Sequence, residues 1–244
     1  MDEIVDVNTL FGPLPAASTD LTMEALLELM QKHQVGVACT LSTLGLLLDP
    51  SVGNAVTRAA CTEYEPLLPV ATLNPMMFFG DDRPLQKFRE EGFRFVRFFP
   101  QMQGWALDFL PFHVLLEALS ALKMPIMVDI DAPGQITMLG RSIENFGAPV
   151  MLSGVATETL AEAVAALRRY STLHIETSQL LAPGNIKMLV DTVGVDRLLF
   201  GTGAPAQPVA SALNTLQYAG LTGDAMHQIL SSNARRLLSI TGQE

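Results

Sequence analysis

The sequence has little charge, few basic residues and a single tryptophan. Charged side chains make up 16% of its 244 residues, against about 25% in a typical soluble domain. Its 15 Lys and Arg are outnumbered by 25 Asp and Glu, which gives a formal net charge of −10. Because phosphate binding needs clustered Lys and Arg, this scarcity predicts that nucleic acid is not a partner.

Cysteine and long apolar runs are also scarce. Cys39 and Cys61 lie in apolar segments without a CxxC spacing, which predicts free thiols in a reducing compartment. No apolar run approaches the roughly 18 residues that a membrane span needs. The acidic start MDEIVDV is the opposite of a secretory signal. We therefore expect a cytoplasmic protein with no membrane partner.

The sequence is rich in short apolar, β-branched segments that alternate with amphipathic stretches. Burial on both faces, as in a parallel sheet covered by helices, explains why these segments are almost uniformly apolar. The eight candidate strands are Ile4–Val7, Val35–Leu41, Leu68–Leu73, Phe93–Phe98, Ile126–Ile130, Val150–Leu152, Leu173–Thr177 and Leu198–Phe200. Helix signals between them include caps at Thr19 or Asp20 and at Asp49-Pro50, a helix of about Arg83–Glu91, and a last helix of about Gly223–Ile240.

Eight strands alternating with helices in about 250 residues predict an α/β fold, a distorted or slightly irregular (β/α)8 TIM barrel. One domain spanning residues 1–244 is the simplest organisation for this length. An open doubly wound sheet is the alternative. No GxGxxG or Walker A motif follows the first strand, so the usual nucleotide fingerprints are missing.

In such a barrel, functional groups come from the C-terminal ends of the strands. Alternation with period two places Asp129 and Asp131 on one face of their strand, and likewise His174 and Glu176. The polar residues and glycines at the strand ends are Asp6, Asn8, Asn74, Arg97, Asp129, Asp131, Ser153, Gly154, His174, Glu176, Ser178, Thr202 and Gly203.

At these strand ends the sequence resembles the amidohydrolase-related barrels. VDVNTLFG is similar to their opening strand, RLLFGTGAP to their last strand and SSNARRLL to their terminal helix. LPVATLNP, FRFVRFFP and MPIMVDI match the third, fourth and fifth strands in order and spacing. The resemblance covers essentially the whole chain and implies a TIM barrel that performs metal-dependent hydrolysis.

The chain departs from this family at the residues that hold the metal. The resemblance places the histidine pair of the first strand on Asn8 and Leu10, and the last-strand aspartate on Gly203. The histidines of the fifth and sixth strands fall on Asp129 and on Ser153 or Gly154. Leu and Gly cannot ligate through their side chains, and zinc needs three or four converging N, S or O ligands. We therefore expect neither a metal nor another cofactor.

The carboxylates leave three interpretations open. Asp129 pairs with Arg97 while Asp131 or Glu176 faces a helix, or the carboxylates together hold Mg²⁺ or Ca²⁺, or a metal-free carboxylate pair is catalytic. Arg97 stands among phenylalanines and needs either Asp129 or an anionic ligand as its partner. Trp105 either walls a ligand pocket or packs in the core.

Three functions are compatible with these patterns. The first is a degenerate barrel that binds a small anion or acts as a non-catalytic homologue. The second is a metal-independent hydrolase of a lactone, ester or amide, with Asp129 as base, Arg97 as anion clamp and Glu176 as a further catalytic candidate. The third is a structural or regulatory oligomer. Candidate ligand-binding residues are Asn8, Asn74, Arg97, Trp105, Asp131, Ser153 and Thr202. Low charge and a mean hydropathy of +0.30 predict a homodimer.

Overall fold

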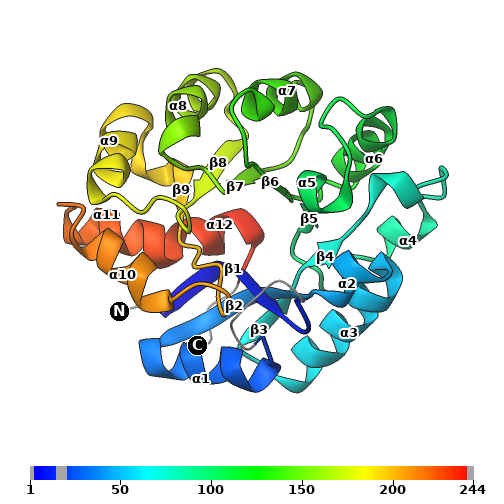
Figure 1. The fold of residues 1–244 in the computed structure, drawn as a ribbon, viewed down its shortest axis with the longest axis horizontal. Helices are drawn as coiled ribbons and strands as arrows, with labels where there is room; N and C mark the ends of the chain where they lie inside the picture. Colours follow the sequence, from blue (N-terminus) through cyan, green and yellow to red (C-terminus); the bar gives the residue numbers. More distant parts are fainter. Residues whose placement is uncertain (1–2, 15–20, 241–244) are drawn as a thin grey trace.

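The computed structural model describes residues 3–14 and 21–240, which form a ring of parallel strands surrounded by helices (Figure 1). The strands are β1 (Ile4–Phe11), β2 (Val35–Ser42), β3 (Leu67–Pro69), β4 (Ala71–Thr72), β5 (Val96–Phe98), β6 (Ile126–Asp129), β7 (Val150–Ser153), β8 (Leu173–Glu176) and β9 (Leu198–Leu199). The helices are α1 (Met23–His33), α2 (Leu44–Leu47), α3 (Pro50–Glu63), α4 (Arg83–Gln86), α5 (Pro100–Gln103), α6 (Leu110–Ala121), α7 (Gln135–Ser142), α8 (Leu160–Arg169), α9 (Pro183–Val193), α10 (Val209–Gln217), α11 (Gly223–His227) and α12 (Asn233–Leu238). Short single turns are η1 (Pro75–Met77), η2 (Thr157–Thr159) and η3 (Val195–Arg197), and a π-helical turn, η4 (Gln228–Ser232), joins α11 to α12.

Backbone hydrogen bonds join the strands into a barrel. The ladders run in the orders β1-β2-β3 and β4-β5-β6-β7-β8-β9. The segment 67–72 bonds to both neighbours, because Val70 N–H donates to Thr40 O at 2.9 Å and Ala71 N–H donates to Phe95 O at 3.0 Å. β1 meets the last strand where Val7 N–H donates to Phe200 O at 2.9 Å and Gly203 N–H donates to Asn8 O at 2.7 Å. The fold is the predicted TIM barrel, with β3 and β4 as parts of one strand.

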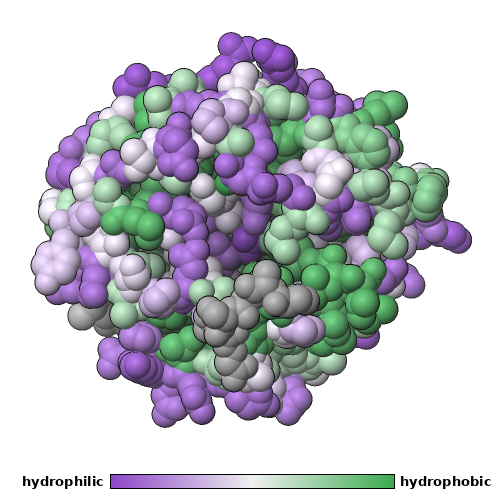
Figure 2. Space-filling view, in the orientation of Figure 1, coloured by the Kyte–Doolittle hydropathy of each residue, from purple (hydrophilic) through white to green (hydrophobic). Residues whose placement is uncertain are grey.

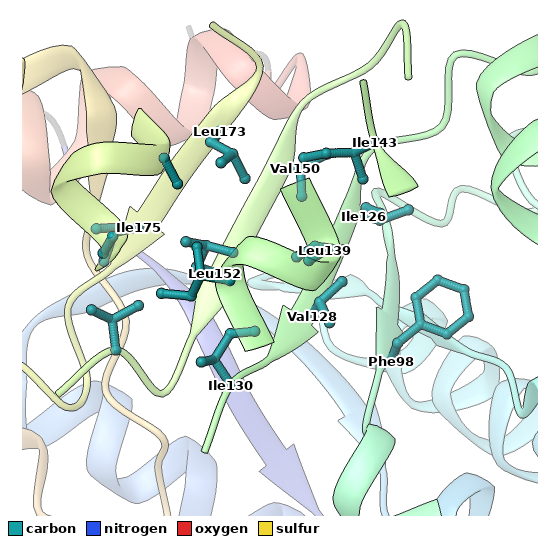
Figure 3. Close-up of a cluster of buried hydrophobic side chains, with 14 of the residues drawn as sticks. Phe98, Ile126, Val128, Ile130, Leu139, Ile143, Val150, Leu152, Leu173 and Ile175 are labelled. Atoms are coloured by element: carbon teal, nitrogen blue, oxygen red, sulfur yellow. The ribbon is translucent and has the colours of Figure 1, made fainter. Parts of the chain in front are cut away.

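Two hydrophobic layers follow from the alternation of side chains along the strands. On β6, Ile126 and Val128 point outward and pack with Leu139 and Ile143 of the α7 region in the larger core cluster (Figure 3). Met127, between them, belongs to a separate cluster of the barrel interior. That interior is filled by side chains from several strands, so the barrel is packed and is not a pore. The interior cluster comprises Val5, Val7, Cys39, Leu41, Val70, Phe95, Phe99, Met127, Met151, Leu199, Ala234, Leu238 and Ile240.

Several element boundaries differ from the sequence-based expectations. The strand expected to reach Ile130 ends at Asp129, and the helix expected over 83–91 is regular only over Arg83–Gln86 and continues as turns. The expected caps Thr19 and Asp20 lie outside the described residues; α1 is capped by Thr22, whose side chain accepts from Ala25 N–H at 3.1 Å. The cap at Asp49-Pro50 is confirmed, because Asp49 Oδ1 accepts from Ser51 N–H at 2.7 Å.

Two further observations concern the thiols and the helices. Cys39 is buried and Cys61 is half-buried, and both are free. In the part of the chain that the structure describes, no helix is long and apolar enough to cross a membrane.

Candidate functional site

The polar groups of the barrel interior form a layer at the C-terminal ends of the strands. Three of them follow an apolar side chain of the interior cluster by two residues. Phe95 precedes Arg97, and Met127 precedes Asp129. Met151 precedes Ser153 in the same way. Period-two alternation keeps each polar residue on the interior face. The barrel is therefore apolar below and polar at its mouth, and Figure 2 shows a hydrophilic hollow near the middle of this face.

Arg97 of β5 is the centre of this layer. Its Nε donates to Asp129 Oδ1 at 2.9 Å and its Nη2 donates to Asp129 Oδ2 at 3.2 Å. Nη1 donates to Asn8 Oδ1 at 2.6 Å, and Nη2 also donates to the Ser153 hydroxyl at 3.2 Å. The guanidinium carbon lies 4.6 Å from the centroid of the Phe99 ring. The structure thus realises the expected Arg97–Asp129 pair in the bidentate form typical of strong carboxylate recognition.

A bulge in β1 brings Asn8 to Arg97. Asp6 pairs with Ala38 and Thr9 pairs with Thr40, so the register between β1 and β2 shifts within this stretch. Such a bulge re-aims a side chain next to a functional site. The Asn8 amide also donates to the hydroxyls of Ser153 and Ser178, each at 3.4 Å.

Glu176 is held by its own strand end. It is fully buried, and it accepts from Ser178 N–H at 2.8 Å and from the Ser178 hydroxyl at 2.7 Å. A Cβ at Gly201 would lie 2.2 Å from Glu176 Oε2 and 3.0 Å from the Asn8 Cβ, so glycine is needed for this packing. Glu176 joins the Arg97 cluster indirectly, through Ser178 and Asn8.

Asp6 and Thr202 form a second polar pair, at the junction of β1 with the last strand. Asp6 accepts from the Thr202 hydroxyl and from Thr202 N–H, the latter at 3.1 Å, and from Asn8 N–H at 3.0 Å. Burial raises the pKa of Asp6 from 3.8 to about 7, with a smaller contribution from the charge of Glu176. The two hydrogen bonds from Thr202 thus hold the Asp6 carboxylate in place. The Thr202 hydroxyl also accepts from Ala204 N–H at 3.1 Å.

Three candidates from the sequence lie apart from this cluster. Trp105 is buried against Phe98 and Phe112, with ring centroids 6.1 and 4.8 Å away, so its contacts are those of core packing. Asn74 caps η1 through Met76 N–H at 3.0 Å and lines a pocket of about 790 Å³ beside α3. Asp131 is exposed in the loop beyond β6, and therefore does not share a strand face with Asp129.

The histidines take no part in the Arg97 cluster. His174 on β8 is buried, with its Nδ1 3.0 Å from Thr172 O, and burial lowers its pKa from 6.5 to about 4. His33 ends α1, His113 lies on α6 with its Nε2 3.3 Å from the Ser142 hydroxyl, and His227 ends α11.

The candidate catalytic and ligand-binding residues predicted from the sequence did not include Ser178, although it was named at a strand end, or Phe99. Ser178 links Glu176 to Asn8, and the Phe99 ring supports the guanidinium. Ser178 follows Glu176 by two residues at a strand end, which is a usable signal. The sequence gives no signal for the orientation of the Phe99 ring.

Arg97 occupies the oxygen donors that a divalent cation would need. Asn8, Asp129 and Ser153, which the resemblance places on metal positions, all contact Arg97. Across residues 3–14 and 21–240, no three His, Cys, Asp or Glu side chains gather as metal ligands. A guanidinium among three such residues does not fit a metal ion, because its positive charge stands where the cation's would.

Comparison with known proteins identifies relatives of the chain. A family model described as amidohydrolase matches residues 80–240. A search of the curated proteins found no match.

Solved structures share the fold at low sequence identity. A 2,6-dihydroxybenzoate decarboxylase complexed with 2,6-dihydroxybenzoate has a TM-score of 0.80 and 14% identity, covering 98% of this chain and 100% of the other. A dihydroxybenzoic acid decarboxylase from Polaromonas sp., with bound manganese and 2-nitroresorcinol, has a TM-score of 0.78 and 12% identity, covering 98% of each chain. A probable 2-pyrone-4,6-dicarboxylic acid hydrolase from Acinetobacter baumannii, with citric acid bound, has a TM-score of 0.72 and 15% identity, covering 98% and 100%.

Proposed function

Because the chain belongs to the amidohydrolase family, we propose that its barrel mouth binds a small carboxylate on Arg97 without a metal ion. One observation carries this proposal: a buried guanidinium is fixed among the three residues that the resemblance assigns to the metal. The planar fork of Arg matches a carboxylate in a bidentate geometry. The metal-dependent hydrolysis of the family is then absent, since nothing lowers the pKa of a bound water.

The names of the structural relatives support a carboxylate as the ligand class. Dihydroxybenzoate, 2-pyrone-4,6-dicarboxylic acid and citric acid are all carboxylic acids. Two of these relatives are decarboxylases and one is a probable hydrolase. Functional groups of TIM barrels lie at the C-terminal ends of the strands, which is where Arg97 lies in this chain.

A second candidate function is metal-independent hydrolysis of a small lactone, ester or amide. The favouring observation is that Asp129 is one-third exposed at the mouth and lies directly beside Arg97. A substrate anchored on Arg97 would place its reacting carbonyl near Asp129, which would then act as the general base.

We also propose that two copies of the chain associate through an apolar surface formed by Leu47, Leu48, Val52, Met76, Met77 and Phe79. Figure 2 shows hydrophobic residues gathered on the side of the ring that holds α2 and α3. Phe79 is 93% exposed and borders the pocket of about 790 Å³. The same surface therefore carries both an exposed aromatic ring and a pocket that could receive the ring of a second copy. A two-fold interface needs such self-complementarity. The charged residues that line the pocket balance in sign, which limits repulsion between two chains of net charge −10. Three are basic and three are acidic: Arg58, Arg83, Lys87, Asp49, Asp81 and Glu91.

Calorimetric titration with benzoate and with citrate tests the ligand proposal. We expect binding to the native protein, a loss of at least about tenfold in affinity for Arg97→Met, and no change for Arg83→Met, whose guanidinium is exposed and pairs with Asp81. Metal analysis of the purified protein should find no stoichiometric ion. One bound ion per chain, no binding of either acid, or unchanged binding by Arg97→Met contradicts the proposal.

A further inference from the structure

Arg97 and Asp129 are held very differently, although they form one ion pair. The Arg97 side chain is 6% exposed and is fixed from other directions by Asn8, Ser153 and the Phe99 ring. The Asp129 side chain is 33% exposed. In the described part of the chain, the hydrogen bonds of its carboxylate all come from Arg97. The cation would therefore stay in place if the carboxylate left.

We propose that Asp129 is a built-in occupant of the carboxylate site and leaves Arg97 when a ligand binds. This inference rests on the proposed function. The ligand carboxylate takes the N–H groups of Nε and Nη2 that Asp129 now occupies, and the Asp129 side chain turns to solvent. The exchange is non-covalent and keeps the number of charge-assisted hydrogen bonds to Arg97 constant.

Position along β6 supports this exchange. Asp129 is the last residue of the strand, and a loop follows with the exposed Asp131. A carboxylate at the end of a strand, with solvent on one side, reaches water by rotating its side chain alone. Glu176 has no such freedom, because it is fully buried and Ser178 donates to both of its oxygens.

The exchange makes Asp129 a determinant of affinity and of ligand release. The Asp129 carboxylate competes with the ligand for Arg97. It therefore weakens the affinity for the ligand by a factor of roughly three to ten, which corresponds to the free energy of a partly exposed ion pair. Removing the negative charge also removes repulsion between Asp129 and the incoming anion.

The test is titration of benzoate into the native protein and into Asp129→Asn, whose amide oxygen still accepts from Arg97 Nε. Asp131→Asn is the matched control, because it removes the same charge two residues away without touching Arg97. We expect three- to tenfold tighter binding for Asp129→Asn and a change below twofold for Asp131→Asn. Asp129→Ser gives a second variant if Asp129→Asn fails to fold.

The outcomes separate this inference from the proposed function. If the native protein binds benzoate and Asp129→Asn binds it equally or more weakly, Asp129 is not a competing occupant and this inference is overturned. An equal gain for Asp131→Asn also overturns it, because general charge then explains the effect. If the native protein binds no carboxylate, the proposed function itself fails.

Discussion

Replacing Arg97 by Met should destabilise the fold by about 3 kcal/mol. Removing one partner of a buried ion pair costs about 3–5 kcal/mol, but Asp129 is one-third exposed and regains water, which lowers the cost. The Asn8 amide oxygen loses its donor at 2.6 Å, and a lost buried partner adds about 1 kcal/mol or more. Loss of the contact with Phe99 adds about 0.5–1 kcal/mol.

Combining Arg97→Met with Asp129→Asn separates the energetic cost of the unpaired charge from the cost of the lost packing. The double variant Arg97→Met, Asp129→Asn leaves neither charge of this pair without its partner, and we expect it to recover about 1–2 kcal/mol of the loss. Urea unfolding followed by far-UV circular dichroism measures both free energies, provided that the slope with denaturant is unchanged. A cost below about 0.5 kcal/mol for Arg97→Met, or no recovery in the double variant, would show that the ion pair does not organise the barrel mouth.

Three further predictions concern residues around the site and the surface. The pKa of Asp6 is about 7 in the folded protein and 3.8 in the unfolded chain. The folded protein therefore binds more protons between these values, and its free energy of unfolding should fall as pH rises through this window. In Asp6→Asn, the free energy of unfolding measured with urea should lose this dependence on pH. Gly201→Ala should destabilise by about 1–3 kcal/mol in the same assay, since its Cβ would meet Glu176 at 2.2 Å; a neutral effect would mean that Glu176 moves freely. Light scattering after size exclusion should show a dimer that becomes a monomer in Phe79→Asp but not in Leu181→Asp, an equally drastic change at another exposed residue; a monomeric native chain refutes the interface.

Most of the barrel could be predicted because its determinants are local. Almost uniformly apolar segments such as 126–130 predict buried parallel strands, since their apolar residues meet either the interior or a helix. The ends of the elements were less accurate, as at Asp129 and over 87–91, because tertiary contacts decide where a strand stops and a turn begins. The bulge in β1 had no sequence signal, yet it delivers Asn8 to Arg97.

The candidate site was predictable where strand alternation alone decides orientation. Arg97, Asp129 and Ser153 were placed at the mouth by this rule, and one of the two interpretations of Arg97, its pairing with Asp129, is what the structure shows. Asp131 and Trp105 follow a strand end, where alternation no longer applies, and both lie elsewhere. Orientation beyond the last paired residue depends on loop packing, which spacing does not encode.

The positive charge at the barrel mouth belongs to an arginine side chain, so it is covalently part of the polypeptide. A chelator cannot extract it, and another ion cannot replace it. Under the proposed function, the positive charge of the mouth is then set when the chain is synthesised and does not depend on which metals the surroundings provide.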